Sequence, residues 1–235
     1  MIHPAVFRCM IYIKEPKQEK MKVEIWSDVM CPFCYIGKRK FETALNSLSR
    51  KDEVEVLWHS FQLSPNQEAE SEMDVYSYLA EMKGQTREWS VMVHDNLTNA
   101  ASLIGLDYHF EKARIANSFD AHRVIQLAKK YKMTDEIEER FFKAYFTEGE
   151  LISDHATLIR LATEAGLPTE EVIQVLKTDQ YSQEVNSDGA EARQLGVRGV
   201  PFFIMNRKYI VSGAQDSGVF KETLQKALND FQLLK

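Results

Sequence analysis

The sequence predicts an α/β fold in which a βαβ unit and a ββα unit are separated by a large helical insertion. Three observations lead to this prediction. Short segments with alternating apolar residues lie near both ends of the chain. Apolar residues at helical spacing dominate the long stretch between them. After Gly196 the spacing returns to that of strands, so both ends of the chain are expected to build one sheet.

The N-terminal unit is predicted to begin with a strand over residues 23–26. A helix is expected from about Cys34 to Ser49, and a second alternating strand over residues 54–58. Strand, helix and strand in this order form a βαβ unit. The unit places Cys31 and Cys34 at the carboxyl end of its first strand.

The insertion is predicted to be helical throughout, over residues 72–195. Thr134 is expected to cap one of its helices, and Asp154 to start another helix that Gly166 ends. The chain contains no internal repeat and no low-complexity stretch. The insertion is therefore expected to interrupt a domain rather than to repeat one.

The C-terminal unit is predicted to contain, in order, a strand over 200–205, a turn at 206–207, a returning strand over 208–212 and a helix capped by Asp216. We therefore expect a single domain in two parts, residues 21–71 and 196–235, around the insertion. Residues 1–20 are expected to be a leader or extension outside this fold. Arg8 interrupts their mildly apolar stretch and no small-residue cleavage site follows it, so a secretory signal fits poorly.

The composition is that of a soluble globular protein, with 44% hydrophobic and 27% charged residues. A net charge of −6 argues against a nucleic-acid partner. No apolar run approaches the length that spans a membrane, so a membrane partner is not expected. Disulfide-stapled secreted folds use more than the three cysteines found here, so we expect a reducing, cytoplasmic location.

The segment Cys31-Pro32-Phe33-Cys34 is the strongest functional signal in the sequence. A thiol at the first turn of a helix faces free N–H groups and the positive end of the helix dipole, which favour its thiolate. The second thiol, one turn on, can close a short disulfide ring, and such a pair passes two electrons to another disulfide. The alternatives are a structural disulfide, half of a zinc site, or inert buried thiols. No second Cys-x-x-Cys or His-x-x-x-His supplies further zinc ligands, so no metal is expected.

Val200-Pro201 is a second candidate feature, because proline is rare at the opening of a strand. A cis peptide bond here would be a specified feature, and it would leave the Val200 backbone free to pair with an extended partner chain. A trans proline on an edge strand is the other interpretation of these two residues.

Four segments resemble the DsbA branch of the thioredoxin superfamily, in particular its FrnE-like cytoplasmic oxidoreductases: residues 28–35, 117–123, 196–203 and 212–215. The resemblance covers about residues 22–231. It implies a thioredoxin fold with a helical insertion, an exposed nucleophile at Cys31, a buried resolving thiol at Cys34 and a cis-proline at Pro201. Pro32, Phe33, Val200 and Pro201 would contact substrate. No cofactor is required, although glutathione could serve as redox partner.

The chain departs from the resemblance at one position behind the dithiol. Thioredoxins and DsbA have a buried acid six residues before the first cysteine, and this chain has Ile25 there. Glu24, one residue away, is predicted to point to the opposite face of the strand. A carboxylate relay to Cys34 is therefore in question.

Three further residues are secondary candidates. His122 and Arg123 lie at or beyond the edge of a predicted buried helix face. They either line a cleft opposite the dithiol, where a cation would favour the thiolate, or are a structural histidine and a surface arginine. Gln215, at the start of the last helix, belongs either to an anion site that could hold glutathione or to a plain helix cap.

The sequence thus predicts a thiol–disulfide oxidoreductase that acts on a thiol- or disulfide-containing protein or small thiol, as a monomer or dimer. One alternative is a glutathione-dependent isomerase or a kappa-class-like glutathione transferase. Those relatives typically have serine at the position of Cys31, so the retained pair argues against them. The other alternative is a non-enzymatic DsbA-like adaptor or chaperone.

Overall fold

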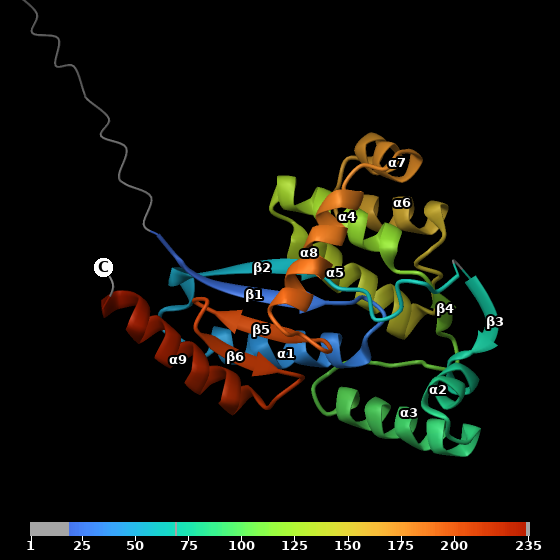
Figure 1. Cartoon of the computed structure of the whole chain (residues 1–235), viewed down its shortest axis with the longest axis horizontal. Helices are drawn as coiled ribbons and strands as arrows, with labels where there is room; N and C mark the ends of the chain where they lie inside the picture. The colour runs from blue at the N-terminus through green and yellow to red at the C-terminus, as the bar shows by residue number, and fades with distance from the viewer. Residues whose placement is uncertain (1–18, 69, 234–235) are drawn as a thin grey trace, which may run out of the picture.

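The computed structural model describes residues 19–68 and 70–233 (Figure 1). The expected leader over residues 1–20 therefore lies almost entirely outside the described residues. Within them, a four-stranded sheet is joined to a large group of helices, as the sequence predicts.

The central sheet is built from both ends of the chain and has the strand order β2-β1-β5-β6. Its strands are β1 (Met21–Ser27), β2 (Val54–Ser60), β5 (Phe202–Met205) and β6 (Tyr209–Ser212). The pair β1 and β2 is parallel, whereas β5 is antiparallel to both β1 and β6. Asn206 and Arg207 form the predicted turn, with φ angles of 53° and 51°.

Helices cover both faces of this sheet. Alternation along β1 places Val23 and Ile25 in one hydrophobic cluster with Phe41 of α1 (Pro32–Asn46) and Phe220 of α9 (Ser217–Leu233). Trp26 points to the other face, where its indole N–H donates to the Asp188 carbonyl of α8 (Ser182–Gln194) at 3.1 Å. A short 3₁₀ turn, Lys51–Glu53, precedes β2.

The insertion is mostly helical, and most of it lies beyond one end of the sheet, whereas its helix α8 packs on a face of the sheet (Figure 1). Besides α8, its helices are α2 (Val75–Lys83), α3 (Arg87–Ser102), α4 (Phe119–Tyr131), α5 (Thr134–Lys143), α6 (His155–Glu164) and α7 (Thr169–Lys177). One π-helical turn, Ala144–Glu148, follows α5. Asp154 caps α6 as predicted, because its carboxylate accepts the Thr157 N–H at 2.7 Å. The prediction that Thr134 caps α5 is wrong, since the cap position is Met133.

The prediction of an entirely helical insertion is also wrong. Two short strands, β3 (Glu70–Asp74) and β4 (Arg114–Ala116), pair antiparallel within it. About forty residues separate these strands along the chain, which is far beyond the reach of a hairpin signal. Each strand is also too short to show a clear alternating pattern.

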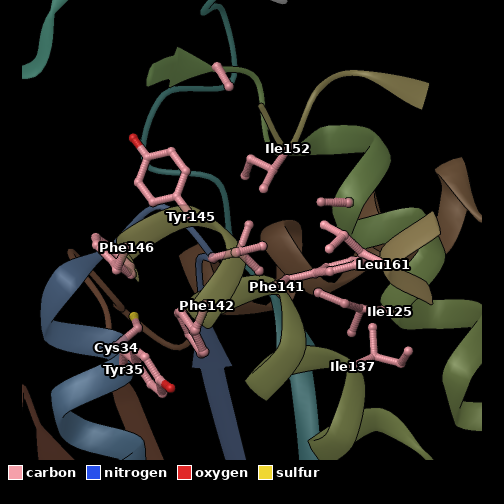
Figure 2. Close-up of a cluster of buried hydrophobic side chains, with 14 of the residues drawn as sticks. Cys34, Tyr35, Ile125, Ile137, Phe141, Phe142, Tyr145, Phe146, Ile152 and Leu161 are labelled. Atoms are coloured by element: carbon pink, nitrogen blue, oxygen red, sulfur yellow. The ribbon is translucent and has the colours of Figure 1, made fainter. Parts of the chain in front are cut away.

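The dithiol segment belongs to the core of the insertion rather than to that of the sheet. Cys31, Cys34 and Tyr35 lie in one hydrophobic cluster with residues of α4, α5 and α6. Figure 2 shows Cys34, on α1, beside Phe142 and Phe146. The first turn of α1 therefore joins the two parts of the fold. Among the described residues, no helix combines the length and apolarity needed to cross a bilayer.

Candidate active site

The two cysteines occupy the first turn of α1. Cys31 is the N-cap residue, with extended backbone angles, and Pro32 follows at the first helical position, where a missing N–H costs nothing. The Cys31 N–H donates to the Asp28 carbonyl at 2.9 Å, and the Cys34 N–H donates to the Cys31 carbonyl at 2.9 Å. This short turn brings the two side chains together, and both are free thiols.

Both cysteines are buried, with exposed fractions of 4% for Cys31 and 1% for Cys34. The burial of Cys34 agrees with the expectation for a resolving thiol. The expectation of an exposed Cys31 is wrong, because the chain returns across it from far along the sequence. The Cys31 thiol donates to the Val200 carbonyl, with 3.5 Å between sulfur and oxygen.

The segment over the dithiol is held by close backbone contacts. The peptide bond between Val200 and Pro201 is cis, as the resemblance implies. The Pro201 carbonyl accepts the Gly213 N–H at 2.8 Å. On the other side, Pro201 packs on Gly37 of α1 so tightly that a Cβ at Gly37 would lie 2.8 Å from the proline Cγ. Glycine at position 37 therefore permits the approach of Pro201 to α1.

The surroundings of the dithiol favour an uncharged Cys34. Burial raises the pKa of the Cys34 thiol well above its usual value, and the hydrogen bond and charge of Cys31 raise it further. The main chain of Asp28 and the Ser27 hydroxyl lie near the Cys34 sulfur and lower the pKa, but burial dominates. Tyr108, whose hydroxyl donates to the Pro32 carbonyl at 2.8 Å, also has a pKa raised by burial.

The remaining residues proposed to contact substrate lie on the surface next to the dithiol. Phe33 is 50% exposed, although it lies between two buried cysteines. Pro32 and Val200 are half-buried. The site thus has one exposed aromatic side chain, Phe33, and the main chain just before β5. Both lie next to the nearly buried sulfur of Cys31.

His122 lies behind the dithiol, whereas Arg123 does not. The His122 ring is fully buried, and its Nε2 is 3.5 Å from an Asp28 carboxylate oxygen. Arg123 is also buried, so the interpretation as a surface arginine is wrong. Its guanidinium donates to the carbonyls of Val175, Thr178 and Gln180 and pairs with Asp120. These contacts join α4 to the α7–α8 connection.

Gln215 has a local structural contact. Its amide donates to the Ser212 carbonyl at 2.9 Å, and the side chain is exposed. Lys40 of α1 reaches the same turn, where its ammonium donates to the Ala214 carbonyl at 3.3 Å and pairs with Asp216 at 2.9 Å. These bonds tie the start of α9 to α1.

A separate group of donors lies on the far face of the sheet. His59, Asp188 and Glu191 have candidate ligand atoms within 4.8 Å of one another. Each already has protein partners: His59 Nδ1 lies 2.9 Å from Asp188, and Glu191 pairs with Arg207. Arg207 also binds Glu24, so Glu24 faces away from Cys34 as predicted. This group connects α8 to the sheet.

Sequence reasoning missed several residues that surround the dithiol. Asp28, Lys38 and Glu138 are buried charged residues, and the Asp28 carbonyl accepts the Cys31 N–H. Lys38 pairs with Glu42 and with two acids of α5, so it joins α1 to the insertion. A lysine and a glutamate within amphipathic helices carry no signal of burial, because the contact that buries each one comes from another element. Asp28 lies in the segment 28–35 that resembles the family, but its residue type alone does not predict its burial.

Comparisons with known proteins agree with this geometry. The family model of the DSBA-like thioredoxin domain matches residues 22–225. The protein YwbO from Bacillus subtilis, which is uncharacterized, is 29% identical over 216 residues, covering 91% of this chain and 98% of that protein.

Solved structures give the same result. The probable DsbA oxidoreductase SCO1869 from Streptomyces coelicolor is 39% identical with a TM-score of 0.85, covering 89% of this chain and 90% of that chain. The cytosolic disulfide reductase DsbM from Pseudomonas aeruginosa has a TM-score of 0.61 at 16% identity, covering 90% and 98%. At that identity the similarity shows a shared fold.

Proposed function

The chain belongs to the DSBA-like thioredoxin domain family, and we propose that it is a thiol–disulfide oxidoreductase whose redox centre is the Cys31–Cys34 pair. The observation that carries this proposal is the placement of two free thiols in the first turn of α1, against the carbonyl of Val200. A helix N-terminus favours a thiolate at its first residue, and a second thiol one turn on can resolve the mixed disulfide.

In the reductive direction, the Cys31 thiolate attacks one sulfur of a substrate disulfide. The substrate S–S bond breaks, a Cys31–substrate bond forms, and the other substrate sulfur leaves as a thiolate that takes up a proton. Cys34, as its thiolate, then attacks the Cys31 sulfur. The Cys31–Cys34 bond forms, the substrate leaves with both sulfurs reduced, and the protein has lost two electrons. An oxidised protein runs the same steps in reverse.

The substrate is proposed to be a disulfide or thiol in an extended peptide or a small molecule. An extended chain could pair with the backbone at Val200 and Pro201 and contact the exposed Phe33 ring. Glutathione is proposed as a redox partner rather than a bound cofactor. A cytoplasmic location is proposed because only three cysteines occur in the chain.

Thiol trapping tests this function directly. The reduced protein is mixed with a peptide that contains one disulfide, quenched with acid, and its free thiols are labelled with a maleimide for mass analysis. Wild type is expected to end with a Cys31–Cys34 disulfide and a reduced peptide. Cys34→Ser should accumulate a covalent protein–peptide adduct, and Cys31→Ser should leave the peptide oxidised.

Two other results would replace the proposal. If the Cys31→Ser variant still converted a substrate in a reaction that requires glutathione, an isomerase or transferase would be favoured. In such an enzyme glutathione supplies the reactive thiol. Full activity in the cell of the double variant Cys31→Ser/Cys34→Ser would favour an adaptor or chaperone.

A further inference from the structure

The resolving step requires Cys34 to lose a proton in a buried position. Burial raises the pKa of this thiol, so few molecules hold the attacking thiolate at neutral pH. The strand behind Cys34 offers only the Ser27 hydroxyl and no basic group. Ile25 is apolar, and Glu24 binds Arg207 on the other face of the sheet. An acceptor must therefore come from another element.

Three buried ionisable residues lie close to one another, and each comes from a different element. Asp28 follows β1, His122 is on α4 and Glu138 is on α5, with exposed fractions of 0%, 0% and 1%. Asp28 connects this group to the cysteines. Its carbonyl accepts the Cys31 N–H, its main chain lies near the Cys34 sulfur, and its carboxylate is 3.5 Å from His122 Nε2.

Packing does not account for this group. Within the part of the chain that the structure describes, neither ring nitrogen of His122 has a hydrogen-bond partner, nor does Oε2 of Glu138. Buried polar atoms in proteins are almost always hydrogen-bonded, and leaving one unpaired costs about 1–3 kcal/mol. Asp28 differs, since its carboxylate accepts the N–H groups of Met30 and Leu63. The unpaired Oε2 of Glu138 is thus free to accept a proton.

We propose that Glu138, beside His122 and Asp28, is a buried proton acceptor for Cys34 in the resolving step. This inference rests on the proposed function. The Cys34 S–H bond breaks, its proton passes to Glu138, and the thiolate attacks Cys31. The Cys31–substrate bond breaks as the Cys31–Cys34 bond forms. The leaving substrate thiolate takes a proton, and Glu138 then releases its own to solvent.

The charges around Glu138 suit this role. Burial raises its pKa to about 7, opposed by the charges of His122 and Lys38. The charged groups that face it are His122 from α4, Lys38 from α1, Asp135 from its own helix and Asp28 from the end of β1. Tyr145, which faces Asp28, remains a neutral phenol because burial raises its pKa. Glu138 therefore changes its protonation near neutral pH, where an acceptor is most effective.

Stopped-flow mixing with an aromatic disulfide that releases a coloured thiol, 5,5′-dithiobis(2-nitrobenzoate), separates the two attacks. Cys31 releases the first equivalent of coloured thiol and Cys34 releases the second. In wild type, the rate of the second phase should rise with pH through an inflection near 7, following Glu138. It should rise again at higher pH, as Cys34 itself loses its proton. Glu138→Gln should remove this inflection and slow the second phase at least about tenfold at neutral pH, because a general base is lost. The first phase should not change.

Matched variants make the result specific. Glu136→Gln removes an exposed carboxylate from the same helix, α5, and should keep the inflection. His122→Gln should slow the second phase as Glu138→Gln does, and it replaces that variant if Glu138→Gln does not fold. An unchanged second phase in the folded Glu138→Gln or His122→Gln variant would overturn the inference, as would equal slowing of both phases.

The same traces test the proposed function separately. Wild type must release two equivalents of coloured thiol and Cys34→Ser only one. If wild type releases one equivalent, or Cys34→Ser releases two, the resolving role of Cys34 is wrong and the proton acceptor has no step to serve.

Discussion

At the residue scale, the two cysteines differ because of where the main chain places them. Cys31 is at the helix N-cap, beside the carbonyl of Val200, whereas Cys34 faces the aromatic core of the insertion (Figure 2). The same Cys-x-x-Cys spacing therefore yields two thiols in different surroundings. An enzyme that exchanges disulfides needs this difference, since one thiol must meet the substrate while the other waits.

The buried thiol can be tested in isolation. In Cys31→Ser, burial still raises the pKa of Cys34, although the contribution of Cys31 is gone. We expect its alkylation by iodoacetamide to be slow and its rate to rise still above pH 9.0, the usual value for this group. The measurement is the alkylation rate against pH, by mass spectrometry. A rate that levels off below pH 8 would contradict the assigned environment.

Glu138 also predicts how stability changes with pH. Its pKa is raised from 4.5 to about 7 in the folded protein, so the native state holds this proton more tightly than the unfolded chain does. The stability from this proton is complete below pH 4.5 and is lost as pH rises to about 7. Glu138→Gln, which cannot ionise, should be relatively more stable than wild type at pH 8 by up to roughly 3 kcal/mol.

Urea unfolding of both proteins at pH 5 and pH 8 measures this effect. The difference between variant and wild type should increase with pH across that interval. A difference that stays constant would show that Glu138 ionises in the folded protein as it does in the unfolded chain.

Phe33 gives a prediction about substrate. Its ring is 50% exposed beside the dithiol, so it adds little to the core but can cover apolar surface of a peptide. Phe33→Ser should raise KM for a disulfide peptide by about tenfold, from the loss of about 1.4 kcal/mol of apolar contact, with little change in Tm. Leu103→Ser, an exposed apolar residue at the end of α3, serves as control and should leave KM unchanged.

The sequence predicts the reactive residues better than it predicts their surroundings. The Cys-x-x-Cys spacing and the helix that follows it are local, and so is the proline that opens β5. The burial of Cys31, His122 and Arg123 is not local. Every residue of α4 from Ala121 to Ala128 is buried, because several elements surround this helix. The spacing of its apolar residues therefore does not show that its polar side chains are buried as well.

At the scale of elements, the contact between α1 and the Val200-Pro201 segment determines the geometry of the site around Cys31. Gly37→Ala would place a Cβ 2.8 Å from a rigid proline ring, so one of the two must move. We expect a loss of about 1–3 kcal/mol in stability and a slower reaction at Cys31. Urea unfolding and the rate of disulfide exchange measure the two effects.

A second glycine provides the control for this substitution. In Gly189→Ala the new Cβ meets only Arg193, at an ordinary 3.6 Å, within the helix α8. That change should stabilise the protein by about 0.5–1 kcal/mol, since alanine favours helix over glycine. If both substitutions had the same effect on stability and rate, the close contact between Gly37 and Pro201 would not determine the position of the Pro201 segment.

Elements with strong local patterns were predicted within a few residues of their bounds. Strands β1, β2, β5 and β6 combine apolar alternation with clear turns, and long helices have periodic apolar faces. The pair β3 and β4 was missed because its first strand is largely polar and its partner is far along the chain. The cap of α5 was missed by one residue, which is within the usual uncertainty of helix ends.

At the scale of the whole molecule, the division into a two-part sheet domain and an insertion remains a prediction. Two features bear on how independent these parts are. Tyr35 of α1 stacks on Phe142 of α5, with 4.9 Å between ring centroids, and donates its hydroxyl to Glu139 at 2.6 Å. The Lys38 ammonium is buried among acids of α1 and α5. One helix thus contributes to both parts.

We therefore expect the sheet and the insertion to unfold together. Separating α1 from α5 would leave Lys38 without its two acidic partners on α5 and would open the apolar cluster around Cys34. Both changes are costly. Trp89→Phe limits the fluorescence to Trp26 and Trp58 in the sheet, while far-ultraviolet circular dichroism reports mainly the helices of the insertion. The two signals should give one urea midpoint. Two separate midpoints would show that the insertion folds independently, and that the dithiol lies at a domain boundary rather than within a single cooperative core.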